Sequence, residues 1–277
     1  MSNDEKPTET PTGTPRKRGF IRKFLFPERL ACIFCDDELP FDSDYSACEV
    51  CLNKLNEKFC SVCGRPVAIP GVCDNCDSRA GTDYKWSFAL ARSAAAYEGY
   101  FRGAVARFKY GGAKYLAKYF ARFMLDVYNR ASAESGFCAD VITYVPLHTK
   151  RLRARGYNQA KLLAECLGGL LGLPVADALV KNTHTVNLAR LKSEERRLAI
   201  KDSFSLNTRT MSDITGKKAL LIDDVFTTGS TVNECARMLR TAKSSDIFVL
   251  TMCSVAAPKT GGTKIKLKKL KSERLKR

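Results

Sequence analysis

The stretch that most constrains the fold is a short apolar run that ends in two adjacent carboxylates and a hydroxyl-rich turn. Residues 217–231 read KKALLIDDVFTTGST. We interpret the run as a strand with Asp223 and Asp224 at its carboxyl end. The turn at Gly229 then leads into a helix predicted over residues 231–241. Because open α/β sheets bind ligands at the carboxyl ends of their strands, the sequence predicts a ligand site here.

The side chains of this turn match a phosphorylated ribose. Backbone N–H groups at a helix N-terminus, with hydroxyls beside them, suit a phosphate. Two adjacent carboxylates suit either a pair of ribose hydroxyls or a magnesium ion. A turn with a purely structural role would need neither adjacent acids nor so many hydroxyls. The candidate binding residues are Asp223, Asp224, Thr227, Thr228, Gly229, Ser230 and Thr231.

The cysteines indicate metal sites. Eight of the twelve fall in four Cys-x-x-Cys pairs within residues 32–76. Each pair supplies two thiolates from one tight turn, and a tetrahedral zinc needs two such turns. Sequential pairing is the simplest arrangement, a cross-braced one is the alternative, and redox pairs are disfavoured because no βαβ pattern surrounds them. The expected zinc ligands are Cys32, Cys35, Cys48, Cys51, Cys60, Cys63, Cys73 and Cys76.

Composition divides the chain into five segments. Residues 1–19 are rich in Thr, Pro and charge and predict a disordered tail. Residues 20–30 predict a short amphipathic helix packed on the next domain, with a membrane-surface helix as the alternative. Residues 31–80 predict the double zinc ribbon, a small module stabilised mainly by its metal. Residues 84–257 alternate strands with helices and predict an α/β domain, and residues 258–277 predict a basic disordered tail.

Within the α/β domain, alternating elements predict βαβ units around an open parallel sheet. The remaining cysteines, Cys138, Cys166, Cys235 and Cys253, are expected to be small buried hydrophobes. Helices are expected over residues 100–110, 114–130, 158–173 and 193–200, besides the helix over 231–241. Strands are expected within residues 86–97, 139–145, 217–225 and 246–255.

The charge pattern bears on partners. The formal net charge is +17, and nine basic residues face a single acid within residues 259–277. This excess predicts a polyanionic partner such as nucleic acid, and a solvated tail that keeps the protein soluble is the alternative. No apolar run approaches the length of a membrane span, and the first residues do not resemble a secretory signal. A cytoplasmic location is expected.

A second cluster of charge follows the strand predicted over residues 139–145. Four cations, Lys150, Arg151, Arg153 and Arg155, fall within six residues. Cations at the carboxyl edge of a parallel sheet are placed to neutralise a pyrophosphate, and the Arg fork suits phosphate oxygens. An exposed basic loop is the alternative.

These motifs resemble known families. Asp-Asp-x-x-Thr-Thr-Gly-Ser-Thr resembles the phosphoribosyl pyrophosphate (PRPP) signature of type I phosphoribosyltransferases. That resemblance implies that the acids bind the ribose 2′ and 3′ hydroxyls and the turn binds the 5′-phosphate. Val-Pro-Leu-His at 145–148 and the basic run at 151–160, with the cysteine pairs, resemble the competence protein F (ComF) family. That family includes the GntX-type proteins and joins a double zinc ribbon to a type I phosphoribosyltransferase-like domain.

The ComF resemblance also implies roles for the second cluster. Pro146, Leu147 and His148 would form the pyrophosphate loop, and residues 151–159 a mobile loop over the site. The chain departs from the family pattern at Leu188 and Ala199, where Gln and Asn are expected. Two polar side chains are lost, which weakens or changes any role of this segment in orienting an acceptor.

Two functions follow as expectations. The first is Mg²⁺-dependent phosphoribosyl transfer, in which an acceptor nitrogen attacks C1 of PRPP as pyrophosphate leaves. His148 is the only titratable candidate base, and a structural hydrogen bond is its other role. The second, implied by the ComF resemblance, is handling single-stranded DNA in competence, using the zinc ribbons and basic tail. The aromatic residues that could stack bases, or pack in the core, are Tyr97, Tyr100, Phe101 and Tyr110.

Overall fold

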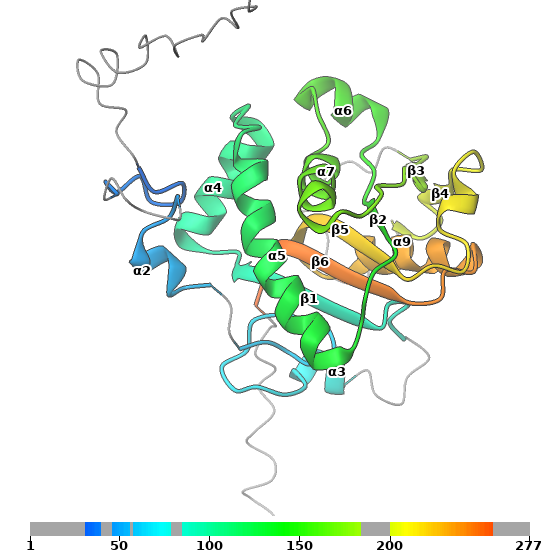
Figure 1. Ribbon diagram of the computed structural model, residues 1–277, viewed down its shortest axis with the longest axis horizontal. Helices are drawn as coiled ribbons and strands as arrows, with labels where there is room; N and C mark the ends of the chain where they lie inside the picture. The colour runs from blue at the N-terminus through cyan, green and yellow to red at the C-terminus, as the bar shows by residue number, and fades with distance from the viewer. Residues whose placement is uncertain (1–30, 40–45, 56–57, 79–84, 184–199, 257–277) are drawn as a thin grey trace, which may run out of the picture.

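The computed structural model describes residues 31–39, 46–55, 58–78, 85–183 and 200–256. The centre of the described chain is a parallel four-stranded sheet (Figure 1). The strands lie in the order β1 (Leu90–Ala96), β6 (Ile247–Ser254), β5 (Ala219–Phe226) and β2 (Val141–Tyr144). The predicted α/β fold with a parallel sheet is therefore confirmed.

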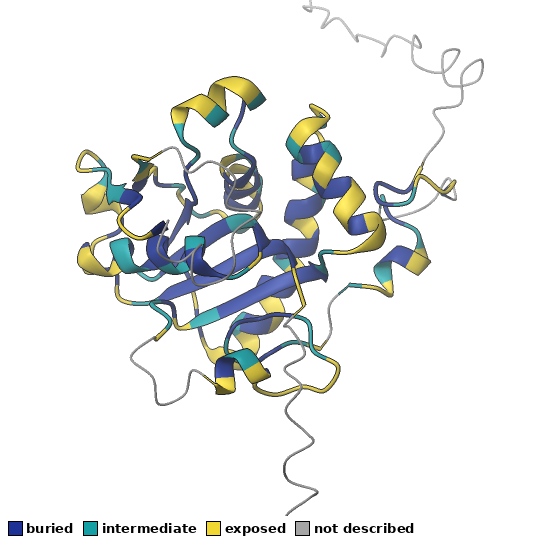
Figure 2. Ribbon diagram, turned by 180° about the vertical axis from the view of Figure 1, so that it is seen from behind, coloured by how far each residue is buried: buried dark blue, intermediate teal, exposed yellow. Residues whose placement is uncertain are grey.

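Helices cover both faces of this sheet. α5 (Leu116–Ser135) and α7 (Gln159–Leu171) pack against each other and the sheet, and α9 (Ser230–Thr241) packs against β5 and β6. Every residue of β6 is buried, as expected for a parallel strand covered on both faces. Figure 2 shows this buried sheet, with exposed residues on the outer sides of the helices. None of the described helices is long and apolar enough to cross a membrane.

The helices expected before the sheet's second strand are present as α4 (Gly99–Tyr110) and α5, and the one after it as α7. Asn158 caps α7, because its Oδ1 accepts hydrogen bonds from the N–H groups of Ala160 and Lys161. The helix expected over 193–200 lies almost wholly outside the described residues. So do the amphipathic helix over 20–30, both predicted tails, and the positions of Leu188 and Ala199.

The basic run after β2 is not the loop that we expected. It is a helix, α6 (Thr149–Arg155). His148 caps its start, with Nδ1 accepting from the Lys150 N–H at 3.2 Å, and Gly156 ends it in a left-handed conformation with φ +76°. Leu, Arg and Ala are good helix formers, so capping at both ends is enough to order the segment.

An antiparallel pair, β3 (Leu179–Lys181) with β4 (Phe204–Leu206), stands beside the main sheet. The sequence pattern did not predict it. The strands are too short to show a period of two, and tertiary pairing alone identifies them.

The two cysteine clusters dock on different parts of the α/β domain. In the first, the ring of Phe34 lies 4.5 Å from that of Phe101 and 5.4 Å from that of Phe123, on α4 and α5. In the second, Gly64 touches β1 directly, since a Cβ added there would lie 2.2 Å from the Ala91 carbonyl oxygen. Figure 1 accordingly shows α2 (Glu49–Leu52) beside α4, and α3 (Asp74–Asp77) apart from it, below the sheet in this view.

Candidate functional site

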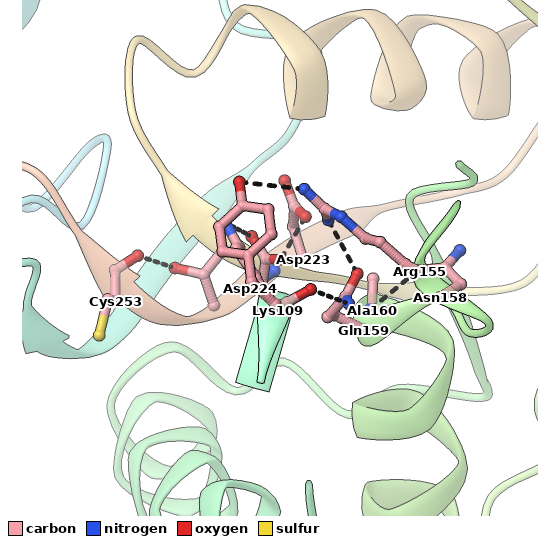
Figure 3. A network of polar contacts seen from close by, with 10 residues as sticks. Lys109, Arg155, Asn158, Gln159, Ala160, Asp223, Asp224 and Cys253 are labelled. Atoms are coloured by element: carbon pink, nitrogen blue, oxygen red, sulfur yellow. Dashed lines mark hydrogen bonds and ion pairs between the residues drawn. The ribbon is translucent and has the colours of Figure 1, made fainter. Parts of the chain in front are cut away.

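The two adjacent carboxylates lie within β5, near its carboxyl end. The Asp224 N–H donates to Asp223 Oδ1 at 2.8 Å. Lys109, near the end of α4, places Nζ 2.7 Å from Asp224 Oδ1, and both side chains are largely buried. Figure 3 shows this ion pair at the centre of a wider polar network. Lys109 was not among the predicted site residues, although the sequence Phe-Lys-Tyr-Gly-Gly at residues 108–112 places it just before a glycine pair that ends a helix.

The electrostatics of the two adjacent carboxyls, Asp223 and Asp224, favour a positively charged ligand. Burial, and then the charge of Asp224, raise the pKa of Asp223 to about 7, against the opposing effect of Lys109. Burial alone would lower the pKa of Lys109, but the charge and hydrogen bond of Asp224 and the charge of Asp223 together outweigh it and raise that pKa. Lys109 therefore acts on both carboxyls but forms its ion pair with Asp224. An additional cation or hydrogen-bond donor would keep Asp223 ionised.

The hydroxyl-rich turn joins β5 to α9. Gly229 has φ +81° and precedes the helix, and as a glycine it has no side chain to cap the first N–H groups of α9. The Thr228 and Ser230 hydroxyl oxygens are 2.9 Å apart, and Thr228 Oγ1 accepts from the Ser230 N–H at 3.3 Å. The turn thus presents hydroxyls and a helix N-terminus together, an arrangement that suits a phosphate.

The α6–α7 junction supports the end of α4. Arg155 donates from Nη1 to Gln159 Oε1 at 3.0 Å and from Nη2 to the Tyr110 hydroxyl at 3.2 Å. Buried Gln159 donates to the Lys109 carbonyl oxygen at 3.5 Å (Figure 3). Tyr157 donates its hydroxyl to the Phe108 carbonyl oxygen. Arg155, predicted to bind pyrophosphate, is thus held by protein acceptors that position Lys109.

A cavity of about 440 Å³ lies beside α6, and two of the other predicted pyrophosphate residues line it. Pro146 and Leu147 line it, together with Lys181 from β3. Burial, and then the charge of Arg151, lower the pKa of Lys181, while Asp223 opposes this. Lys181 therefore lies within electrostatic reach of both charged clusters. Sequence reasoning missed it because the β3–β4 pair that carries it was not predicted.

Two predicted residues have other surroundings. Arg153 is exposed on α6. His148 caps α6 through Nδ1. This is a structural hydrogen bond, the alternative to the role of catalytic base.

The eight paired cysteines form two separate clusters of four, grouped sequentially as Cys32, Cys35, Cys48, Cys51 and Cys60, Cys63, Cys73, Cys76. Within each cluster the sulfur atoms lie within 4.8 Å of one another. Hydrogen bonds from Cys63 and Cys76 lower the pKa of Cys60, and the bond to Cys60 raises the pKa of Cys76 to about 12. Because the thiols cannot all ionise without a cation, both clusters fit a tetrahedral zinc.

Comparison with known proteins agrees with this arrangement. A double zinc ribbon domain matches residues 21–77, and a phosphoribosyl transferase domain matches residues 168–272. Competence protein ComFC of Bacillus subtilis is 28% identical over 240 residues, which cover 81% of this chain and 95% of that protein. The two domain matches and this relative support a ComF-type family. The chain's phosphoribosyl transferase fold indicates a ribose phosphate as the class of ligand.

Other ComF-type relatives match over shorter or comparable lengths. Competence protein F of Haemophilus influenzae is 33% identical over 147 residues, covering 52% of this chain and 64% of that protein. DNA utilization protein YhgH of Salmonella typhimurium is 27% identical over 216 residues, covering 76% of this chain and 91% of that protein.

The other cysteines and the aromatic residues of this ComF-type chain meet the predictions only in part. Cys235 and Cys253 are buried as expected, Cys166 is half-buried, and Cys138 is exposed, so the expectation for Cys138 is wrong. Cys138 follows the end of α5 in a connection at the surface. Of the four aromatic residues considered for stacking, Phe101 is buried, Tyr97 half-buried, and Tyr100 and Tyr110 exposed.

Proposed function

We propose that this ComF-type chain binds PRPP with Mg²⁺ and transfers its phosphoribosyl group to a nitrogen acceptor. The observation that carries the proposal is the meeting, at one edge of the sheet, of two carboxylates with a phosphate-type turn and a group of cations. Asp223 and Asp224 would bind the ribose hydroxyls, and the turn before α9 the 5′-phosphate. The pyrophosphate would then lie toward Lys181 and Arg151. These two positive charges repel each other, and a bound anion would relieve that repulsion.

The chemistry needs little beyond positioning and charge. The bond from C1 to the pyrophosphate oxygen breaks, and its electron pair leaves with pyrophosphate as the acceptor nitrogen bonds to C1. Bound Mg²⁺, held by the Asp223 and Asp224 carboxylates directly or through water, would supply positive charge to the departing group. Lys181 and Arg151 add fixed positive charge where negative charge develops, and such electrostatic stabilisation usually lowers the barrier more than any other single effect.

Titration calorimetry tests this proposal. With Mg²⁺ present, PRPP should bind more tightly than either ribose 5-phosphate or pyrophosphate, because it reaches both halves of the site. Lys181→Met should weaken PRPP binding by roughly 10- to 100-fold, the usual loss for a charge-assisted hydrogen bond.

Ribose 5-phosphate supplies the internal comparison, because Lys181→Met should change its affinity little. Lys218→Met is the matched control, since Lys218 precedes β5 at its opposite end. Equal PRPP affinity in all three proteins would exclude the proposed pyrophosphate position, and no PRPP binding by the unmodified chain would exclude the function.

We propose a second role in the cytoplasm, the handling of single-stranded DNA. Its support is the net charge of +17 and the names of curated relatives, which include "Competence protein" and "DNA utilization protein". Affinity for a single strand should fall steeply as salt rises, because each neutralised phosphate releases counterions. A chain ending at Pro258 should show a shallower dependence, and an equal slope would exclude the tail.

A further inference from the structure

The single tryptophan of the chain, Trp86, lies between the second cysteine cluster and the phosphate turn. Its side chain lies beside Cys76 of that cluster and acts to lower the pKa of that thiol, against the larger effect of Cys60. The indole N–H is the only donor that a tryptophan side chain offers, so this end of the ring faces the sulfur. A metal-bound Cys76 would be a thiolate and a stronger acceptor than a thiol.

The opposite edge of the same indole meets Gly229. A Cβ added to Gly229 would lie 2.7 Å from Trp86 Cη2 and 2.5 Å from Phe226 Cζ. These are closer than any real Cβ contact, so the backbone of the turn rests directly on the two rings. One rigid side chain thus spans the distance from a candidate metal ligand to the pivot of the phosphate turn.

Two neighbouring contacts strengthen the connection. Arg65, buried beside Cys63, places its guanidinium 5.3 Å from the centre of the Phe226 ring. The Ser87 N–H, adjacent to Trp86, donates to Asn233 Oδ1 in the first turns of α9 at 2.7 Å. The second cluster therefore reaches both the base of the turn and the helix that follows. The first cluster instead contacts α4 and α5, through the ring of Phe34 and the carbonyl oxygen of Ile33.

We propose that Trp86 is a positioning residue that couples the second cysteine cluster to the phosphate turn. With metal in the cluster, the N–H end of the indole is held and its other edge supports Gly229. Without metal, the indole is no longer held at Cys76, and the turn at Gly229 is no longer held in place by the indole. By thermodynamic linkage, a ligand in the turn must then strengthen metal binding at this cluster by the same factor. The identity of that ligand as a ribose phosphate rests on the proposed function.

The test compares hydrogen exchange in the zinc-loaded full chain and two variants. Trp86→Phe keeps an aromatic ring but removes the N–H donor, and Cys35→Ser disables the first cluster instead. Trp86→Phe should raise the exchange rate of residues 227–233 by at least about fivefold, a typical coupling, while β6 stays protected. Cys35→Ser should leave that segment unchanged.

Two further readouts use the same proteins. Ribose 5-phosphate should bind Trp86→Phe at least about fivefold more weakly than the unmodified chain. In the unmodified chain, ribose 5-phosphate should slow zinc release from one of the two clusters and leave the other unaffected. This last measurement needs no variant to fold.

The outcomes distinguish the role of Trp86 from the proposed function. Equal exchange of residues 227–233 in the unmodified chain and Trp86→Phe, with β6 protected in both, would overturn the positioning role. So would a zinc-release rate that ribose 5-phosphate leaves unchanged while it binds. If ribose 5-phosphate does not bind at all, the proposed function is wrong, and the exchange comparison still decides the role of Trp86.

Discussion

Replacing Asp223 by asparagine should abolish PRPP binding and make the free protein more stable at pH 8. Burial, and then the charge of Asp224, raise the pKa of this carboxyl from 3.8 to about 7. The folded protein therefore binds the proton more tightly than the unfolded chain. The resulting cost to stability is absent below about pH 4, grows as pH rises to about 7, and then stays constant.

The size of this effect follows from the shift. Three pKa units correspond to roughly 4 kcal/mol, an upper limit for the stability that Asp223→Asn gains at pH 8. The gain should shrink as the pH is lowered toward 4. Denaturant unfolding at several pH values measures it, and calorimetry with PRPP and Mg²⁺ measures the loss of binding.

Asp126→Asn is the matched control, because Asp126 is an exposed carboxylate on α5. It should alter neither binding nor the pH dependence of stability. If Asp223→Asn binds PRPP normally, Asp223 is not a ligand of the ribose. If instead the variant is less stable than the parent at pH 8, the Asp223 carboxylate stabilises the fold. The expected destabilisation by its charge would then be excluded.

Removing zinc should unfold residues 31–78 and lower the melting temperature of the whole chain. The second cysteine cluster is buried and the first is partly buried. Both pack few large apolar side chains of their own, so metal supplies most of their folding energy. Unfolding of the first cluster also removes the ring of Phe34 from its contacts with Phe101 and Phe123. Losing one buried Phe costs roughly 3–5 kcal/mol, which is about 10 °C in a domain of this size.

Limited proteolysis and calorimetry before and after chelation check this expectation, and added zinc should restore the parent pattern. Cys32→Ser should reproduce only the part of this change that comes from the first cluster, namely cleavage around that cluster and a lower melting temperature. Cys138→Ser, which removes an exposed cysteine outside both clusters, should resemble the parent. Complete metal removal with an unchanged cleavage pattern and melting temperature would show that the ribbons fold without metal.

The sequence predicted those parts of the molecule whose structure depends on residues close together in the chain. The β5–turn–α9 unit is read from one continuous stretch, in which the apolar run, the glycine and the hydroxyls follow directly. The sequential grouping of the cysteines also follows from short spacings, since a thiolate pair in one turn most easily meets the next pair along the chain.

The residues that the sequence did not predict meet the site through tertiary contacts. Lys109 reaches Asp224 from α4, and Lys181 arrives on a strand of three residues. Nothing in the local pattern of either lysine specifies its partner. The helix α6 was missed for another reason. Its dense charge was interpreted as a loop, its N-terminal cap His148 as a binding residue, and its C-terminal cap Gly156 as part of the mobile loop.

The order of strands in the sheet has a consequence for biosynthesis. Among the described strands of this sheet, β1 is the first along the chain and its partner β6 is the last. The hydroxyls of Ser93 and Thr251 form a hydrogen bond between them, 158 residues apart in sequence. A ribosome releases β1 long before β6, so the sheet closes only when nearly all the described chain has emerged. The cysteine pairs are local and precede β1, so they can take up metal first. Metal can therefore bind before the sheet closes, and the site that we propose for PRPP is completed last.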